Sequence, residues 1–226
     1  MITIIPAILA KTEEEYSKYV EKVRGIKTLE SNWVHIDFMD NLFVQNQSIG
    51  LDVVKKYPIE LKKEAHLMVM RPLDWLDELL ELGFERIIVH AEAEDVEKCI
   101  EYIKGRGREV GLALKLETDL EKVKPFLERI DVLLIMTIEI GFQGQPMKPE
   151  AIEKINYAVS VRSSNSSALL SVDSYHYVVG VDGHINDEDV KQIVEAGAEN
   201  LVIGSYFMES DNIDERVEKI KEKLKS

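Results

Sequence analysis

Two side chains that could do chemistry, His35 and Asp37, interrupt an otherwise apolar stretch at residues 33–38. The stretch has the composition of a buried strand, and side chains two residues apart lie on the same face of a strand, so the imidazole and the carboxylate are neighbours. Burying either group is costly unless a partner or a ligand satisfies it. Imidazole nitrogens and carboxylate oxygens bind divalent transition metals, so the pair is a candidate for half of a metal site.

Further polar residues, among them His66, His90 and Asp182, fall at the C-terminal ends of other predicted strands. In a barrel these ends surround one mouth, so His66 and Asp182 can join the first pair. Two imidazoles and two carboxylates suit Zn²⁺, Mn²⁺, Fe²⁺ or Co²⁺. Taken singly, each residue has an ordinary explanation, because a histidine that closes a strand is usually a hydrogen-bonded core residue and an aspartate before glycine is usually in a turn.

The elements that must position these residues follow from hydrophobic periodicity. Eight apolar runs alternate with amphipathic, helix-like runs, and the apolar runs are nearly continuous, as expected of parallel strands covered on both faces. The predicted strands are Thr3–Leu9, Trp33–Phe38, Glu64–Met68, Arg86–His90, Glu109–Leu116, Val132–Ile138, Tyr175–Val181 and Asn200–Ile203. This order predicts an α/β protein, a single-domain (β/α)₈ TIM barrel over residues 1–226. The alternative is an open doubly wound sheet, but no Gly-x-Gly-x-x-Gly turn follows the first strand.

Local signals indicate where several helices begin and end. Thr12, with Glu15 three residues later, is a capping box at the start of the first helix. Pro72 suits the first turn of a later helix, and Gly83 suits its C-terminal cap. The serine-rich stretch at residues 163–167 is predicted to be a loop before the seventh strand.

Composition argues against some functions. The chain of 226 residues carries a formal net charge of −14, whereas nucleic-acid binding needs basic surface. The single cysteine, Cys99, permits no internal disulfide and lies at helical spacing among apolar residues, so we predict that it is a core residue. We find no signal-like N-terminus and no run of about 20 apolar residues, and therefore expect a soluble cytoplasmic protein with no membrane association.

In these residues the chain resembles the ribulose-phosphate 3-epimerase family, and the resemblance covers nearly the whole sequence. The most specific blocks are His35-Ile-Asp-Phe-Met-Asp40 and His66-Leu-Met-Val69, in order and correctly spaced. Other matching segments are Ile5-Pro-Ala-Ile-Leu9, Asn46-Gln-Ser-Ile-Gly50, Val89-His-Ala-Glu92, Gly141-Phe-Gln-Gly-Gln145, Val181-Asp-Gly183 and Gly204-Ser205.

The resemblance implies an isomerase of carbohydrate metabolism that inverts C3 of a 2-ketose 5-phosphate and interconverts ribulose and xylulose 5-phosphates in the pentose phosphate pathway. It implies that Asp37 and Asp182 are the catalytic acid/base pair, one on each face of the sugar. The implied ligands of a divalent ion are His35, Asp37, His66 and Asp182. His90 would support the site without binding the ion.

The resemblance also implies how the sugar phosphate is held. Met39, Met68 and Met136 would form apolar walls that keep water from the intermediate, although methionines at such positions more often serve packing. Glycine-rich turns after the last three strands would bind the phosphate through backbone N–H groups. The implied substrate-binding residues are His66, Gly141, Phe142, Gln143, Gly144, Gly183, His184, Gly204 and Ser205. Barrels of this family commonly assemble, which implies a homo-oligomer.

The sequence departs from the family pattern around the substrate and leaves the proposed metal and acid/base residues intact. A usual serine is replaced by Ala7, and usual glycines are replaced by Asn41, Gln143 and His184, while Glu139 adds a negative charge before the phosphate turn. These changes leave alternatives open: an epimerase for a different sugar phosphate, a sugar-phosphate decarboxylase or aldolase on a related barrel, or a non-catalytic paralogue.

Overall fold

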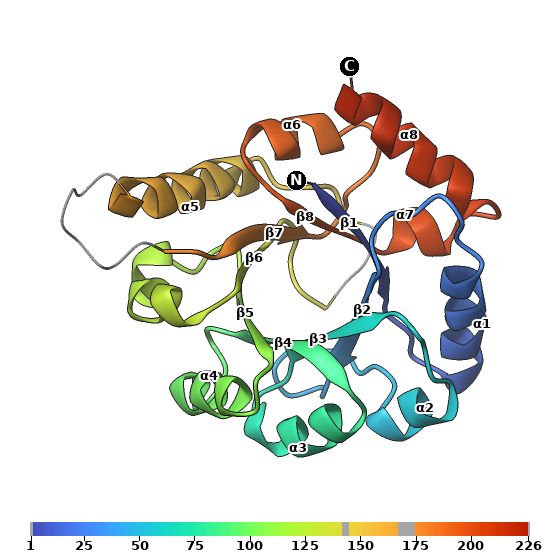
Figure 1. Ribbon diagram of the computed structural model, residues 1–226, viewed down its shortest axis with the longest axis horizontal. Coiled ribbons are helices and arrows are strands. Elements are labelled where there is room, and N and C mark those ends of the chain that lie inside the picture. The colour runs from blue at the N-terminus through green and yellow to red at the C-terminus, as the bar shows by residue number, and fades with distance from the viewer. Residues whose placement is uncertain (1, 142–144, 167–174, 226) are drawn as a thin grey trace.

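Eight parallel strands close into a barrel surrounded by helices in the computed structural model, which describes residues 2–141, 145–166 and 175–225 (Figure 1). The strands are hydrogen-bonded in chain order, and β8 pairs with β1 to close the ring. Their bounds are β1 Thr3–Ile8, β2 Trp33–Met39, β3 Lys62–Met68, β4 Phe84–His90, β5 Glu109–Leu114, β6 Val132–Met136, β7 Val178–Asp182 and β8 Asn200–Ile203. The predicted (β/α)₈ barrel is confirmed.

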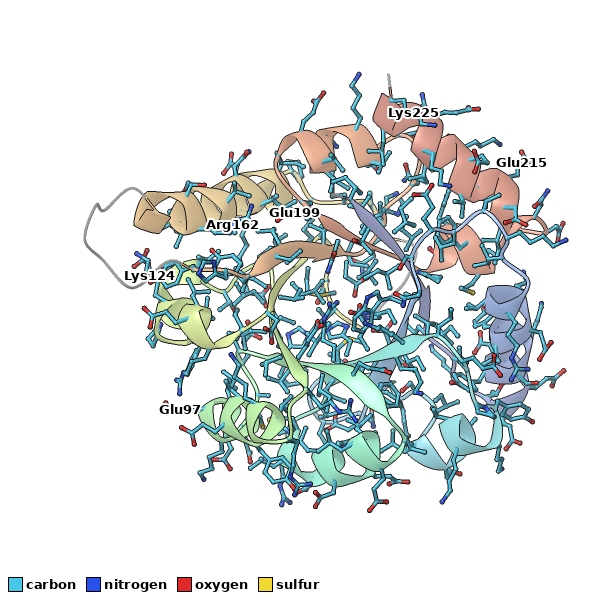
Figure 2. All side chains as sticks on the ribbon, viewed as in Figure 1. Glu97, Lys124, Arg162, Glu199, Glu215 and Lys225 are labelled. Atoms are coloured by element: carbon cyan, nitrogen blue, oxygen red, sulfur yellow. The ribbon has the colours of Figure 1, made fainter. Side chains whose placement is uncertain are left out.

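Helices follow the strands and form the outer layer of the barrel (Figure 1). Their bounds are α1 Glu13–Arg24, α2 Leu51–Lys56, α3 Leu73–Glu81, α4 Val96–Gly105, the 3₁₀ helix η1 Leu120–Arg129, α5 Glu150–Ser166, α6 Val190–Glu195, α7 Ser205–Met208 and α8 Ile213–Lys225. Charged side chains such as Glu97, Glu215 and Lys225 project outward from this layer (Figure 2). Within the described ranges, no helix is both long enough and apolar enough to cross a membrane.

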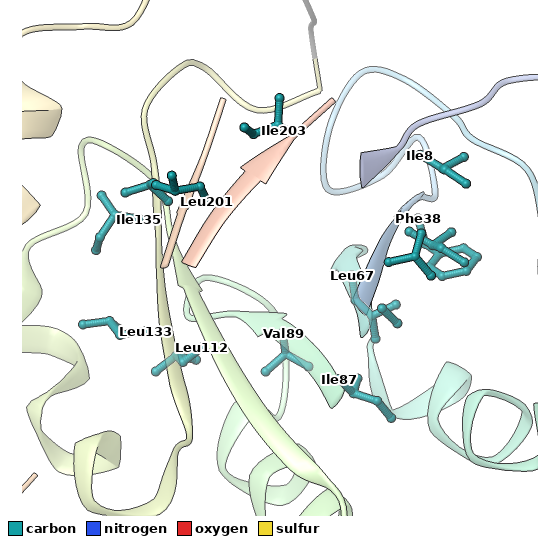
Figure 3. Close-up of a cluster of buried hydrophobic side chains, with 14 of the residues drawn as sticks. Ile8, Phe38, Leu67, Ile87, Val89, Leu112, Leu133, Ile135, Leu201 and Ile203 are labelled. Atoms are coloured by element: carbon teal, nitrogen blue, oxygen red, sulfur yellow. The ribbon is translucent and has the colours of Figure 1, made fainter. Parts of the chain in front are cut away.

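The strands have two different faces, and this division explains the polar residues of β2. Val34, Ile36 and Phe38 point toward the helices and belong to the large buried cluster between strands and helices, part of which is drawn in Figure 3. His35 and Asp37 alternate with them and therefore lie on the inner face of the barrel. Because burial of Val34, Ile36 and Phe38 against the helices fixes the orientation of β2, the two polar side chains must face the barrel interior.

A second, smaller apolar cluster fills the barrel itself. Its members come from the inner faces of the strands and from the loops at the mouth, and they are Ala7, Met39, Val44, Met68, Ile88, Ala113, Leu134, Met136, Ile140 and Val202. Because these side chains pack against one another, the barrel interior is a core and not a channel. His35 is in register with Ala7, and His66 with Ile88, so the polar residues of β2 and β3 lie at the level of this cluster.

The helix-end predictions are confirmed at α1 and α3. The Thr12 side chain accepts a hydrogen bond from the Glu15 N–H at 3.2 Å, and the Glu15 carboxylate accepts one from the Lys11 N–H at 2.7 Å. Gly83 follows α3 with a φ of +75°, and its N–H donates to the carbonyl of Leu80. The predicted core position of Cys99 is also confirmed.

Three sequence predictions differ from the structure near the barrel's sixth and seventh strands, the first being that the seventh strand begins at Val178 and not at Tyr175. The serine-rich stretch is helical and not a loop over residues 163–166, because α5 continues to Ser166, and residue 167 lies outside the described residues. The Ser163 hydroxyl donates to the carbonyl of Val159 at 2.9 Å, which satisfies this polar group inside the helix. The sixth strand ends at Met136 and not at Ile138, because Met136 is the last residue paired with β7 and Thr137 then binds the Asp182–Gly183 turn.

Gly111 tests how tightly the barrel interior is packed. A Cβ at this position would lie 2.5 Å from Cγ1 and 3.0 Å from Cβ of Ile88, and the latter atom cannot move without the backbone of β4. We expect Gly111→Ala to lower the free energy of unfolding by about 1–3 kcal/mol, as overpacking usually does. Urea denaturation followed by circular dichroism measures the change.

Gly105→Ala is the matched control. This glycine ends α4, and a Cβ there would meet no atom within 4 Å. Its free energy of unfolding should stay equal or rise by about 0.5–1 kcal/mol, because alanine restricts the unfolded chain. Equal losses of stability in the two variants would contradict the close packing of β5 against Ile88.

Candidate active site

Four side chains from three strands meet at the inner side of the barrel mouth. His35 and Asp37 lie on β2, His66 on the neighbouring β3, and Asp182 ends β7. One ligand atom of each lies within 4.8 Å of the other three. Both imidazoles are fully buried, whereas the side chains of Asp37 and Asp182 are 9% and 15% exposed. The structure thus brings together the four residues that the sequence indicated, and leaves the carboxylates accessible from the mouth.

The distances between these atoms suit a divalent metal ion. Asp37 Oδ1 lies 3.2 Å from His35 Nε2 and 2.9 Å from His66 Nδ1. Asp182 Oδ2 lies 4.0 Å from His35 Nε2 and 3.5 Å from His66 Nδ1. Ligands of a tetrahedral ion with bonds of about 2.1 Å are about 3.4 Å apart, which falls inside this range. The buried histidine and aspartate cluster therefore fits a metal site.

His66 is held from behind by a second histidine. His66 Nε2 lies 2.9 Å from His90 Nε2, and the two rings stack with centroids 5.0 Å apart. His90 Nδ1 in turn lies 3.2 Å from a carboxylate oxygen of Glu92. If Nδ1 of His66 faces the ion, its Nε2–H donates to His90, and His90 then donates to Glu92. This order of donors leaves the site-facing nitrogen of His66 free to bind a metal.

His35 is held by residues that sequence reasoning missed. Its Nδ1 lies 2.7 Å from Glu64 Oε1, and Glu64 Oε2 accepts a hydrogen bond from Arg86 at 2.5 Å. A signal for this contact was present in the sequence, because Glu64 precedes His66 by two residues on the same strand face, as His35 precedes Asp37. The pairing of Glu64 with His35 could not be read from that spacing, since the two lie on different strands.

The cluster shifts the proton affinities of its members. Burial disfavours charged imidazoles, but Asp37 and Glu64 outweigh it and raise the pKa of His35 well above its ordinary value. The pKa of His66 is raised as well, since its hydrogen bonds to Asp182 and Asp37 outweigh burial. Burial would raise the pKa of Asp37, yet the two histidines hold it below its ordinary range. Burial dominates at His90 and lowers its pKa to about 4, so His90 is neutral near pH 7.

A pocket opens over the cluster, and most of the predicted substrate-binding residues line it. Its lining includes predicted residues from six places in the sequence, namely Asp37, Met68, Met136, Gly141, the segment Asp182–His184, and Gly204 with Ser205. Met39 is buried in the same apolar cluster as Met68 and Met136 but does not line this pocket. Phe142, Gln143 and Gly144 lie outside the described residues. Sequence reasoning missed the apolar lining residues Leu9, Ile138, Ile140 and Ile185.

The turns around the pocket have unusual backbone conformations. Gly183 has a φ of +115°, and a Cβ there would lie 2.7 Å from Ile138 and 2.8 Å from Thr137. His184 and Asn41, which replace glycines of the family pattern, retain left-handed backbones with φ of +48° and +60°. The side chains have thus been accommodated without loss of the turn geometry that glycine would favour.

The other departures from the family pattern lie in different environments. Ala7 lines the pocket and is paired with His35 across β1 and β2, so the missing hydroxyl would have faced the site. Glu139 is exposed and lines a neighbouring groove that also includes Phe43 and Lys115. Its charge therefore lies outside the pocket that contains the two aspartates.

Comparison with known proteins agrees with this architecture. The model of the ribulose-phosphate 3 epimerase family matches residues 3–208. A ribulose-phosphate 3-epimerase of Chlamydia trachomatis is 36% identical over 199 residues, covering 85% of this chain and 82% of that protein. The ribulose-phosphate 3-epimerase of Treponema pallidum is 31% identical over 208 residues, covering 91% and 90%.

Solved structures with lower sequence identity share the fold. The 3-keto-L-gulonate-6-phosphate decarboxylase of Vibrio cholerae superposes with a TM-score of 0.69 at 11% identity, covering 99% of this chain and 97% of that one. At such identity the likeness extends to the barrel alone, whereas the family match and the curated relatives extend to the enzyme class. The chain belongs to the ribulose-phosphate 3 epimerase family and is an isomerase of the epimerase type.

Proposed function

We propose that this protein is a metal-dependent ketose-phosphate 3-epimerase that interconverts D-ribulose 5-phosphate and D-xylulose 5-phosphate. The observation that carries the proposal is that two carboxylates on strands three places apart around the barrel, Asp37 and Asp182, approach the same two buried imidazoles under an open pocket. Inversion at a carbon needs one group on each of its faces, and this arrangement supplies two.

The reaction requires removal of a weakly acidic proton. The C3 hydrogen of a 2-ketose lies next to the carbonyl, and its removal leaves a negatively charged ene-diolate. A divalent ion such as Zn²⁺, Mn²⁺, Fe²⁺ or Co²⁺, held by His35, Asp37, His66 and Asp182, would supply the positive charge that stabilises the ene-diolate. One aspartate takes the C3 proton from one face, and the other aspartate gives its own proton to C3 from the opposite face. The two carboxyl groups exchange protonation states in each inversion.

The rest of the pocket is suited to hold and shield such an intermediate. Met68 and Met136 line it beside the carboxylates and would keep water from the ene-diolate. On the other side, Gly183, Gly204 and Ser205 would offer backbone N–H groups to the phosphate. Local amides are needed for this purpose, because the chain as a whole has a net charge of −14 and repels an anion.

Substitution of either aspartate should separate hydrogen exchange at C3 from inversion. In Asp37→Asn and Asp182→Asn the remaining carboxylate can act on one face only, so we expect kcat to fall at least about 10²-fold. Each variant should still exchange the C3 hydrogen of its substrate slowly with deuterated solvent, but without inversion. This exchange should occur in only one of the two substrates, ribulose 5-phosphate or xylulose 5-phosphate. The two variants should prefer opposite epimers. NMR of each substrate in D₂O measures exchange and inversion together.

Asp74→Asn is the matched control, because this aspartate is exposed on α3. It should leave both rates unchanged. Inversion at a rate near the wild type in either active-site variant would contradict the two-base arrangement. If the wild-type protein exchanges no C3 hydrogen in a panel of ketose phosphates, the proposed reaction is wrong.

Metal binding by the two histidines should depend on pH. The pKa values of His35 and His66 are raised in the metal-free protein, so both imidazoles hold protons that an ion must displace. Because these pKa values lie above the ordinary 6.5, Zn²⁺ affinity should already decrease as pH falls from about 9 toward 6. Competition with a chromophoric chelator gives the affinity, and calorimetry in buffers of different ionisation enthalpy gives the protons released.

Metal removal provides the corresponding control on activity. Dialysis against a chelator should abolish epimerisation, and added Zn²⁺, Mn²⁺, Fe²⁺ or Co²⁺ should restore it. Zn²⁺ affinity that is constant between pH 6 and 9, with no proton release, would contradict the protonated state of the two histidines.

A further inference from the structure

We propose that Glu64 and Arg86 form a positioning pair that makes His35 a metal ligand through Nε2 and raises the metal affinity of the site. The inference rests on the metal centre of the proposed function and concerns residues outside the four ligands. The Glu64 side chain is 1% exposed and that of Arg86 is 9% exposed, so neither charge is there to interact with solvent. Buried charges of this kind need a structural or functional reason.

The position of Glu64 determines which nitrogen of His35 carries the proton. Glu64 Oε1 lies 2.7 Å from His35 Nδ1, while His35 Nε2 faces Asp37 at 3.2 Å. An ionised carboxylate only accepts hydrogen bonds, so a neutral imidazole beside it keeps its hydrogen on Nδ1. The lone pair then lies on Nε2, on the side of the site, where a metal ion can use it.

Arg86 holds Glu64 in the orientation that this requires. Its Nη1 donates to Glu64 Oε2 at 2.5 Å, so each carboxylate oxygen of Glu64 has one partner. Arg86 is itself fixed by two hydrogen bonds to Glu109, of 2.8 and 2.6 Å, and by stacking 4.1 Å from the ring centroid of Trp33. Because an arginine only donates and stays charged, it favours an ionised Glu64.

The register of the barrel produces this row directly. His35 pairs with Glu64 across β2 and β3, Glu64 with Arg86 across β3 and β4, and Arg86 with Glu109 across β4 and β5. A change of strand register by one residue would turn any of them to the outer face. The row therefore begins at the imidazole of His35, continues through the buried side chains of Glu64 and Arg86, and ends at the half-exposed carboxylate of Glu109.

The two metal-facing histidines thus have different supports. His66 has the imidazole of His90 behind it, whereas His35 has the carboxylate of Glu64. A carboxylate partner makes an imidazole a stronger ligand than a neutral partner does. Loss of the charge on Glu64 should therefore weaken metal binding although Glu64 does not touch the ion.

The test is the affinity of Glu64→Gln for Zn²⁺, measured by chelator competition without substrate. The NH₂ group of the glutamine must face either Arg86 or His35 Nδ1. In the first case the hydrogen bond to Arg86 is lost, and in the second the glutamine no longer accepts a hydrogen bond from His35 Nδ1. We expect affinity to fall about 10- to 100-fold, the usual effect of removing such a partner. Thermal unfolding of the metal-free variant and its circular dichroism report separately on the fold.

Glu109→Gln is the matched control, since Glu109 binds the same arginine with the same chemistry but does not contact Glu64 or His35. Its Zn²⁺ affinity should stay within about twofold of the wild type. As a single substitution, Arg86→Met should weaken Zn²⁺ binding. Added to Glu64→Gln, it should change the Zn²⁺ affinity by less than a further twofold, because Arg86 acts through Glu64. Equal losses in Glu64→Gln and Glu109→Gln would contradict the proposal, as would no loss in Glu64→Gln.

A measurement on the wild type does not depend on the variants folding. In the zinc-loaded protein labelled with ¹⁵N-histidine, long-range ¹H–¹⁵N spectra should show His35 with its hydrogen on Nδ1. A hydrogen on Nε2 would overturn the inference. Failure of the wild type to bind Zn²⁺, Mn²⁺, Fe²⁺ or Co²⁺ would instead remove the metal centre of the proposed function, so the two failures are distinguishable.

Discussion

The structure depends on one constraint, which is that two imidazoles and two carboxylates share a small, nearly dry volume at the barrel mouth. None of the four can be left without a partner at that depth, because unpaired buried polar groups cost free energy. They satisfy part of this need for one another: Asp37 lies within 3.2 Å of both histidines. The remaining nitrogens point outward from the cluster and contact Glu64 on β3 and His90 on β4, so the polar region extends to one further strand.

The packing of the barrel confines these polar groups. The outer faces of the strands are apolar and pack against the helices (Figure 3), while a smaller apolar cluster occupies part of the barrel interior. Replacing a buried ion pair by apolar residues is often neutral or favourable for stability. Glu64 and Arg86 are therefore better explained by what they do to His35 than by a gain in stability. This part of the interior serves the site at the mouth.

Two residues near the pocket, His184 and Asn41, keep the left-handed backbone that glycine favours although each carries a side chain. His184 and Asn41 adopt left-handed conformations that cost a non-glycine residue on the order of 1 kcal/mol. Such a cost is tolerated because neighbouring contacts hold the turns: the Thr137 hydroxyl donates to the Gly183 carbonyl, and the Asn41 N–H donates to the Asn46 carbonyl at 2.9 Å. The pocket can thus change its side chains around the substrate while the two aspartates keep their places.

The sequence by itself determined the barrel and the identity of the four clustered residues, since strand alternation and the placement of polar residues at strand ends are local patterns. Only the tertiary structure decided that Glu64 stands behind His35, and that His90, which the family resemblance implied as a supporting residue, stands behind His66. Glu64 lies 29 residues from His35 and His90 lies 24 residues from His66, and no spacing rule relates them. Their contacts depend on strand register and barrel closure. The end of β6 and the length of α5 were likewise decided by pairing across strands and by hydroxyl-to-carbonyl hydrogen bonds, which composition does not reveal.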